Sequence, residues 1–330
     1  MKITPFFASL LLAIGFLSFS SCIDDDGNPV TPVTLCTDVN YLGFRADGQS
    51  PGTPIEVVSN ATADFSTTSF VANTSFTPSV NTIGNNSAAW DNVGLRMVYI
   101  DQWNNSGLWV YNFGSTVTQV SVPTANPITA PEFINGQLYV VEVDYSAQML
   151  LLRPLSIVGT TSVLGTPLHV MTFANFPFNP DTVNNYLYSS SDQSNQLYIM
   201  GTEKLLIYDV TTFSATVVGL PTGGRHLDVV WTQDGTLLSV FHSASGSSDL
   251  VRLDVSGPTA TSATAISGLD VNPESIALVY KECGDRLHIM THFVFGGSGV
   301  TTRFYEVEMN SLGMISRDFP GWIVGIAHRY

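Results

Sequence analysis

Three short segments of the chain carry the side chains best suited to chemistry. They read Ala130-Pro131-Glu132-Phe133-Ile134, Gly224-Arg225-His226-Leu227-Asp228 and Asn272-Pro273-Glu274-Ser275-Ile276. The repeated Pro-Glu-x-Ile pattern predicts that Glu132 and Glu274 occupy equivalent places at the starts of two strands, with His226 in the matching place of a third. Two carboxylates and one imidazole around a common axis are able to hold a divalent cation, and oxygen ligands favour calcium. The structural alternative is that both glutamates accept backbone hydrogen bonds at turns.

Other motifs with a known chemistry are missing from the sequence. It contains no Gly-x-Ser-x-Gly nucleophile elbow, phosphate loop or metalloprotease helix. His288 and His292 are four residues apart, a spacing that brings ligands together on a helix but separates them by about 13 Å on a strand.

Aromatic side chains suggest a second kind of site, for ligand contact. Trp103 and Trp109 lie near one predicted hairpin, and aromatic faces suit sugar rings. Trp90 and Trp322 fall near the predicted starts of two inner strands. The alternative is that these aromatic side chains pack inside the protein.

The elements that must position these residues are predicted to be strands. Lys, Glu and Arg are scarce, and short runs rich in β-branched and aromatic residues alternate with turn clusters. A pair of such runs recurs five times. The first members are 96–100, 137–141, 196–200, 236–240 and 286–290, and the second members are 108–112, 150–154, 205–209, 250–254 and 304–308.

The spacing of this repeat predicts an all-β propeller. Successive pairs are about 42 to 55 residues apart, close to the roughly 40–50 residues of a four-stranded blade. The length of the chain then allows about six blades. One strand without partners, Trp322–Ala327, remains at the C-terminus, and unpaired strands remain near 41–44, 55–58 and 65–71. We therefore expect strands from both termini to form the last blade and close the ring. Two β-sandwiches in tandem, joined near 175–185, are the alternative.

The N-terminal residues indicate export. Lys2, an apolar run from Phe6 to Phe19 and two serines before Cys22 are typical of a secretory signal peptide. We expect a signal peptide at residues 1–21, a flexible tether at 22–35 that is rich in Asp, Pro and Thr, and a single propeller domain at 36–330.

The segment around Cys22 resembles a known class of exported protein. Phe19-Ser20-Ser21-Cys22 resembles the lipobox of bacterial lipoproteins, with Phe19 where Leu is usual. Cys22 followed by Asp24-Asp25-Asp26 resembles the surface-export signal of lipoproteins from the Bacteroides–Flavobacterium group. The resemblance implies a lipid, such as palmitate, on Cys22 and display on the outer face of the outer membrane.

Two further cysteines are present, Cys36 and Cys283. An exported protein meets an oxidising compartment, where an even pair of cysteines usually forms a disulfide. Closure of the ring would also bring the two regions together. The alternative is two separate buried thiols.

One blade resembles the blades of a family of hydrolases. The stretch from Asn272 to Met290 is similar to the Pro-Glu-x-Ile-Ala blade start of six-bladed phytase-like and sugar-lactone hydrolases. The resemblance implies metal-assisted ester hydrolysis supported by the glutamate. The chain has only 12 Lys and Arg residues, so the basic cluster needed to hold phytate is missing.

Charge and composition narrow the choice of partners. The formal net charge is −15, although charged residues make up only 12% of the chain. Nucleic acid requires clustered Lys and Arg, so it is not expected as a partner. We predict a surface-displayed binding or scaffolding module without catalysis or cofactor, for a protein or glycan ligand. The alternative is a calcium-dependent ester or lactone hydrolase that uses Glu132, His226 and Glu274 at the mouth of the central channel.

Overall fold

The computed structural model describes residues 40–46, 54–60, 71–76, 88–91, 93–101, 107–177, 187–192, 194–273, 275–281, 285–295 and 299–329. Cys22, Cys36, Trp103, Glu274 and Cys283 lie outside these ranges, and what was predicted for them stays a prediction. Every regular element in the described ranges is a β-strand. These ranges hold no helix of the length and apolar character needed to cross a membrane.

The strands form six antiparallel sheets, which we number as blades in chain order. Blade 1 consists of β4 (Ala88–Asp91), β5 (Arg96–Asp101), β6 (Gly107–Asn112) and β7 (Val117–Val120). Blade 2 consists of β8 (Ile128–Ile134), β9 (Gln137–Asp144), β10 (Met149–Val158), β11 (Thr161–Leu164) and β12 (His169–Thr172). Blade 3 consists of β13 (Tyr188–Ser191), β14 (Gln196–Met200), β15 (Lys204–Asp209) and β16 (Ser214–Gly219).

The other three blades follow the same order from the innermost to the outermost strand. Blade 4 consists of β17 (Gly224–Trp231), β18 (Leu237–Ser243), β19 (Ser248–Asp254) and β20 (Thr261–Ile266). Blade 5 consists of β21 (Ile276–Lys281), β22 (Arg286–Phe295), β23 (Gly299–Glu308) and β24 (Met314–Pro320). Blade 6 consists of β25 (Trp322–Arg329), β1 (Asn40–Ala46), β2 (Ile55–Asn60) and β3 (Val71–Phe76).

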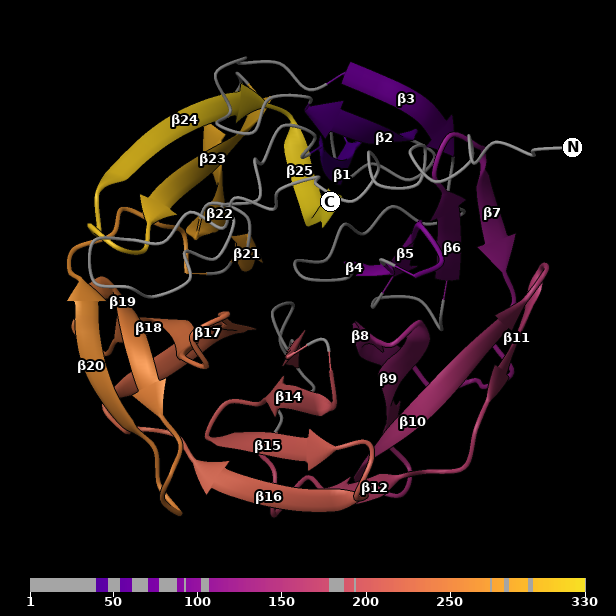
Figure 1. Ribbon diagram of the computed structural model, residues 1–330, viewed down its shortest axis with the longest axis horizontal. Helices are drawn as coiled ribbons and strands as arrows, with labels where there is room; N and C mark the ends of the chain where they lie inside the picture. The colour runs from indigo at the N-terminus through magenta and orange to yellow at the C-terminus, as the bar shows by residue number, and fades with distance from the viewer. Residues whose placement is uncertain are drawn as a thin grey trace, which may run out of the picture. The chain divides into compact units, whose positions relative to one another are not determined.

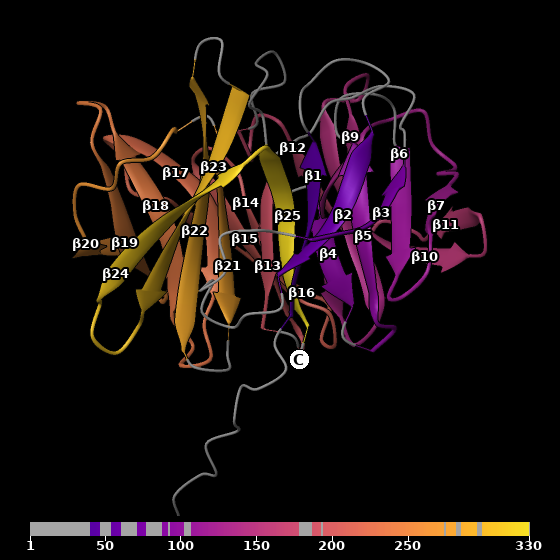
Figure 2. The ribbon, with the colours of Figure 1, turned by 90° about the horizontal axis from the view of Figure 1, so that it is seen from above.

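The six blades are arranged as a propeller, as the sequence predicts. The innermost strands contact one another in the cyclic order β4, β8, β13, β17, β21 and β25, and β25 returns to β4. Figure 1 shows this ring, with the first strand of each blade toward the centre and the fourth at the rim. Figure 2 shows the same blades from the side, with their strands running up and down between the two faces.

The apolar runs of the sequence form the contacts between blades. In β14, Leu197 and Ile199 pack with blade 2, whereas Tyr198 and Met200 pack with blade 4. Side chains of a strand alternate between the two faces of its sheet, and both faces of a blade are covered by neighbours. A middle strand is therefore largely apolar on both faces, which explains why the repeat reads as continuous apolar runs.

Strands from both termini close the ring. β25 pairs antiparallel with β1, from Asn40 opposite Arg329 to Ala46 opposite Trp322. This confirms the shared last blade. The fourth, outermost strand of this blade is Val71–Phe76. The strand predicted from the sequence, 65–71, ends where the observed strand begins.

Candidate functional site

Glu132 lies on the innermost strand of blade 2, next to an irregularity in that strand. The pairing of β8 with β9 shifts register between Thr129 and Glu132, and Ala130 has a φ of 50°. Pro131 has no N–H to donate, and a bulge is a place where a strand needs none. The Oγ of Ser191, on β13 of the next blade, donates a hydrogen bond to Glu132 Oε1 at 3.0 Å.

Burial changes the acidity of Glu132. The surrounding protein raises the pKa of its carboxyl to about 7, although hydrogen bonds from the Ser191 hydroxyl and the Phe133 N–H act in the opposite direction. The side chain keeps part of its surface accessible. A carboxyl group with a pKa near neutrality is able to donate or accept a proton at physiological pH.

Asp228 is a second buried carboxyl group, on the innermost strand of blade 4. It lies at a register shift between Leu227 and Val229 and has a φ of 64°. Its Oδ1 accepts the N–H of Val229 at 2.7 Å, and its Oδ2 accepts the N–H of Leu278 in blade 5 at 2.6 Å. The side chain therefore joins blade 4 to blade 5.

Glu132 and Asp228 are electrostatically connected. Asp228 is 1% exposed, and burial raises its pKa to about 8, with the charge of Glu132 adding to the rise. Two like charges close together in a low-dielectric interior disfavour ionisation of each other. We call Glu132 and Asp228 the carboxyl pair.

His226 lies two residues before Asp228, and its imidazole is uncharged. The Ser239 hydroxyl donates its hydrogen to the backbone oxygen of Asp228 at 2.7 Å. In the 3.2 Å contact between Ser239 Oγ and His226 Nδ1, the imidazole N–H is therefore the donor. His226 Nε2 is then an acceptor, and it has no hydrogen-bond partner within the described ranges. Burial alone lowers the pKa of His226 to about 4, so the ring is neutral at pH 7.

The two copies of the Pro-Glu-x-Ile pattern do not occupy equivalent places. Ile134 is the last residue of β8, whereas Ile276 is the first residue of β21. Glu132 is thus the fifth of the 7 residues in its strand, and the prediction that it begins that strand is wrong. The predicted strand begins after Pro131, but the bulge accommodates Pro131 within β8. Glu132 is brought near Asp228, a residue the sequence analysis did not single out.

The segment before β21 is held to blade 5 by polar contacts. The N–H of Asn272 donates to Thr291 Oγ1 at 2.9 Å, and the Asn272 side-chain amide donates to the backbone oxygen of His292 at 3.0 Å. Ser275 hydrogen-bonds to His292 Nδ1. These contacts fix the residues on either side of position 274.

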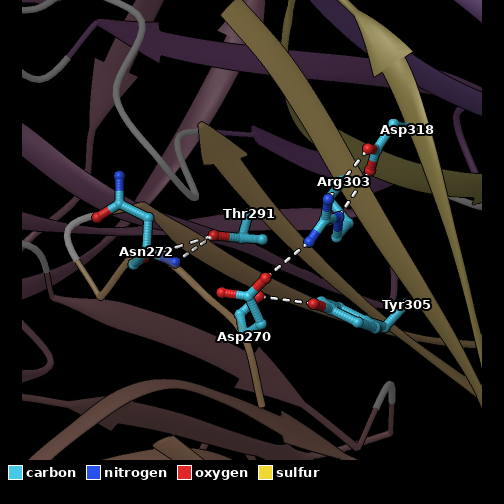
Figure 3. Close-up of polar contacts among 6 residues, drawn as sticks. All are labelled: Asp270, Asn272, Thr291, Arg303, Tyr305 and Asp318. Atoms are coloured by element: carbon cyan, nitrogen blue, oxygen red, sulfur yellow. Dashed lines mark hydrogen bonds and ion pairs between the residues drawn. The ribbon is translucent and has the colours of Figure 1, made fainter. Parts of the chain in front are cut away.

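An arginine anchors the same segment from the rim. Arg303 donates to both carboxylate oxygens of Asp318, at 2.7 and 3.1 Å, and to Asp270 Oδ2 at 2.8 Å. The Tyr305 hydroxyl donates to the backbone oxygen of Asp270 at 2.6 Å. Figure 3 shows Arg303 between the two aspartates, with Tyr305 and the Asn272–Thr291 contact beside them. We call Asp270, Arg303, Tyr305 and Asp318 the blade 5 clamp.

The tryptophans proposed for ligand contact are largely structural. Trp109 is 5% exposed and packs against Tyr99 and Phe76 between blades 6 and 1. Trp90 and Trp322 are half-buried and pack against the same cluster. Trp322 also stacks on His292, with ring centroids 5.1 Å apart. Trp109 thus packs inside the protein, which is the alternative that the sequence analysis left open.

The described side chains do not form an evident metal centre. Within the described ranges, no group of three or more His, Cys, Asp or Glu side chains is placed to hold a metal ion. Both oxygens of Asp228 already accept backbone N–H groups. The calcium hypothesis joins Glu132 to Glu274, which lies outside the described ranges, so a calcium ion shared by these two glutamates stays a prediction.

Comparison with known proteins identifies the fold but no family. No family model matches the chain, and no curated protein matches it. A protein of unknown function from Bacteroides caccae superposes with a TM-score of 0.55 at 12% identity, covering 88% of this chain and 99% of that one. A protein from Lactobacillus plantarum gives 0.53 at 13% identity, with 89% and 99% covered. A chain of a nidogen/laminin complex gives 0.53 at 11% identity, with 88% and 98% covered.

Proposed function

We propose that this chain is a surface lipoprotein whose propeller binds a protein partner without catalysis. The observation that carries this proposal is a set of exposed apolar side chains on one face of the ring. Within each blade, the hairpins from first to second strand and from third to fourth strand lie on the same face, which we call the hairpin face. Its exposed large apolar residues are Val93, Leu95, Phe113, Val158 and Phe213.

The position of these side chains favours binding over chance exposure. They come from blades 1, 2 and 3, which are consecutive in the ring. Val93 is 74% exposed and Phe213 is 66% exposed, and the N–H of Phe113 donates to the oxygen of Leu95, which keeps two of the hairpins together. Apolar side chains gathered on one face commonly mark a protein contact. A similar propeller occurs in a nidogen/laminin complex, which supports a role in protein binding.

The polar interior supports the absence of catalysis. Asp228, Ser189 and Ser191 direct their hydrogen bonds to backbone or side-chain groups of neighbouring blades. Such contacts join neighbouring blades and give these groups a structural role.

The binding proposal is tested by changing the hairpin face alone. Phe213→Asp should abolish cross-linking to the partner in intact cells. Val217→Asp is the matched control, because Val217 is 43% exposed on the outer strand of the same blade. A partner captured equally by wild type and both variants would contradict the proposal.

The anchor is tested separately. Cys22 should incorporate labelled palmitate, and protease added to whole cells should digest the propeller, as the lipobox-like and acidic residues around Cys22 suggest. A Cys22→Ala protein that stayed membrane-bound would rule the anchor out.

A second candidate function is hydrolysis of an ester or lactone. The observation in its favour is Glu132, a half-buried residue whose carboxyl pKa is raised to about 7 by burial and which therefore suits acid–base chemistry. Turnover on an ester and lactone panel, with and without added calcium, should be lost in Glu132→Gln. Equal turnover in the variant, or none in wild type, would exclude this function.

A further inference from the structure

Blade 2 departs from the other blades at its rim. The outer edge of β10 is paired by two strands, β11 along Leu155–Val158 and β12 along Met149–Leu152. The residues between them, 165–168, interrupt the fourth strand. In the other described blades the fourth strand is one continuous element. Where one copy of a repeat departs from the others, the difference commonly serves a function.

A buried ion pair lies beneath this interruption. Arg153 Nε is 2.6 Å from Glu142 Oε2, and Arg153 Nη1 donates to the backbone oxygen of Gly165 at 2.8 Å. The other carboxylate oxygen, Glu142 Oε1, accepts from Thr124 Oγ1 at 2.6 Å and from the Asn126 amide at 3.0 Å. Glu142 is 4% exposed. A buried charge is stable only when it is paired in this way.

The ion pair forms the floor of an open pocket between blades 1 and 2. The pocket has a volume of about 380 Å³, and its lining includes Pro123, Thr124, Glu142, Arg153, Ser162 and Val163. This volume lies in the lower part of the range of small-molecule sites. Val163 is 58% exposed at its rim, so apolar surface is available beside the polar floor.

The hydrogen-bonding groups of the pocket define what it accepts. Arg153 Nη2 has no partner within the described ranges and is not enclosed, so it is a free donor. The Thr124 hydroxyl hydrogen goes to Glu142, and the Ser162 hydroxyl hydrogen goes to the oxygen of Ser121 at 2.8 Å. Thr124 Oγ1 also accepts the N–H of Asn126 at 3.0 Å. Each hydroxyl oxygen can therefore serve a ligand only as an acceptor, through its remaining lone pair. A matching ligand must both accept and donate hydrogen bonds.

The charge of the pocket selects among such ligands. Glu142 and Arg153 neutralise each other, so the site offers no net charge to a charged ligand. A carboxylate or phosphate would bring no donor for the Thr124 and Ser162 oxygens and would face Glu142. An ammonium ligand would face the free Nη2 donor of Arg153. Hydroxyl groups both donate and accept. The C–H faces of a sugar ring suit Pro123 and Leu164, which also lines the pocket and lies two residues from Ser162, on the same face of β11.

We propose that this pocket binds a neutral polyhydroxylated ligand of about the size of one sugar residue. The site is separate from the hairpin face and does not depend on the protein-binding proposal. Arg153 donates to a ligand hydroxyl, Thr124 and Ser162 accept from others, and Leu164 covers one face of the ring.

The test uses the full chain and a panel of methyl glycosides. Saturation-transfer NMR should detect binding of at least one neutral glycoside of glucose, galactose, mannose or fucose at up to about 10 mM. Glucuronate and glucosamine should bind at least tenfold more weakly. Leu164→Trp should fill the pocket and weaken binding at least tenfold, and Ser162→Ala should weaken it several-fold. Val217→Trp is the matched control on the rim of blade 3 and should leave binding unchanged.

Three outcomes would overturn the proposal. They are no binding of any neutral glycoside to the wild-type protein, equal binding of the charged sugars, and binding that is unchanged in both Leu164→Trp and Ser162→Ala. Thermal unfolding of each variant shows whether it is folded.

Discussion

The imidazole Nε2 of His292 donates a hydrogen bond to the backbone oxygen of Ile323 at 2.6 Å. This contact joins blade 5 to β25, the strand that closes the ring. Thr302 Oγ1 accepts the N–H of Ile323 at 2.9 Å and donates to the oxygen of Gly321 at 2.8 Å. Both backbone groups of Ile323 are thus satisfied by side chains of blade 5, so the closing strand is held from two sides.

Replacement of His292 should loosen this closure. His292→Ala leaves the buried oxygen of Ile323 without its donor and removes the ring stacked on Trp322. We expect a loss of about 2–4 kcal/mol in the free energy of unfolding, measured with urea. His242→Ala is the control, because His242 makes one contact, to Ser248 Oγ at 2.8 Å, and is only half-buried. Equal losses in both variants would show that His292 has no special role in closure.

The carboxyl pair should make stability depend on pH above neutrality. The folded pKa values of Glu132 and Asp228, about 7 and about 8, lie above their ordinary values of 4.5 and 3.8. The folded state therefore holds these protons more tightly, and stability falls as pH rises through this window. His226 and His292, with pKa values lowered to about 4 from 6.5, act in the opposite direction between those two values. Above pH 6.5 only the carboxyl contribution remains.

Glu132→Gln tests this dependence. The glutamine oxygen still accepts a hydrogen bond from Ser191, but the ionisable group is gone. The pKa of Asp228 should then be raised less, because the charge of Glu132 no longer contributes. The melting temperature should fall between pH 6.5 and 8.5 in wild type and fall less in the variant. Each kcal/mol lost from the free energy of unfolding should lower it by about 2–4 °C. A variant with the same pH slope as wild type would contradict the assignment.

Asp228 should be hard to replace because it combines an unusual backbone with two buried contacts. Asp228→Ala removes the acceptor for the N–H groups of Val229 and Leu278, and it places alanine at a φ of 64°. We expect a loss of about 3–5 kcal/mol. Asp228→Asn keeps one acceptor and a residue type that tolerates this φ, so it should lose less. Urea unfolding compares the two, and a larger loss in Asp228→Asn would be inconsistent with this account.

The members of the blade 5 clamp should contribute unequally to the free energy of unfolding. The side chain of Asp270 is 77% exposed, so Asp270→Ala should cost less than about 1 kcal/mol, and 1 M salt should remove the difference from wild type. Tyr305→Phe loses a half-buried hydrogen bond to the backbone oxygen of Asp270 and should cost about 1–2 kcal/mol at any salt concentration. A salt-sensitive loss in Tyr305→Phe would mean that the hydroxyl acts through the ion pairs.

The fold could be predicted because each blade repeats one local pattern. Apolar runs such as 137–141 and 196–200 became middle strands, β9 and β14, since burial on both faces favours apolar residues at successive positions. The leftover strand at Trp322 indicated the shared blade, because a single strand must find partners somewhere in a closed ring.

The interior site could be predicted only in part, because bulges and neighbouring blades decide it. The position of Asp228 depends on one extra residue in β17, and its partner Leu278 belongs to another blade. The one signal in the sequence was an aspartate inside an otherwise apolar run, Leu227–Trp231. No such signal in the sequence marks the Glu142–Arg153 pair, because the pair depends on the register between β9 and β10.

The register of the closing blade has a mechanical consequence. Asn40 lies opposite Arg329, at one end of the ladder between β1 and β25. Tension applied between these two residues pulls across the ladder and opens its hydrogen bonds one pair at a time, beginning at that end. Tension applied between Asn40 and Trp322, at the other end of the ladder, loads all the bonds together in shear. The ring should therefore unzip at low force in the first geometry and resist a much higher force in the second.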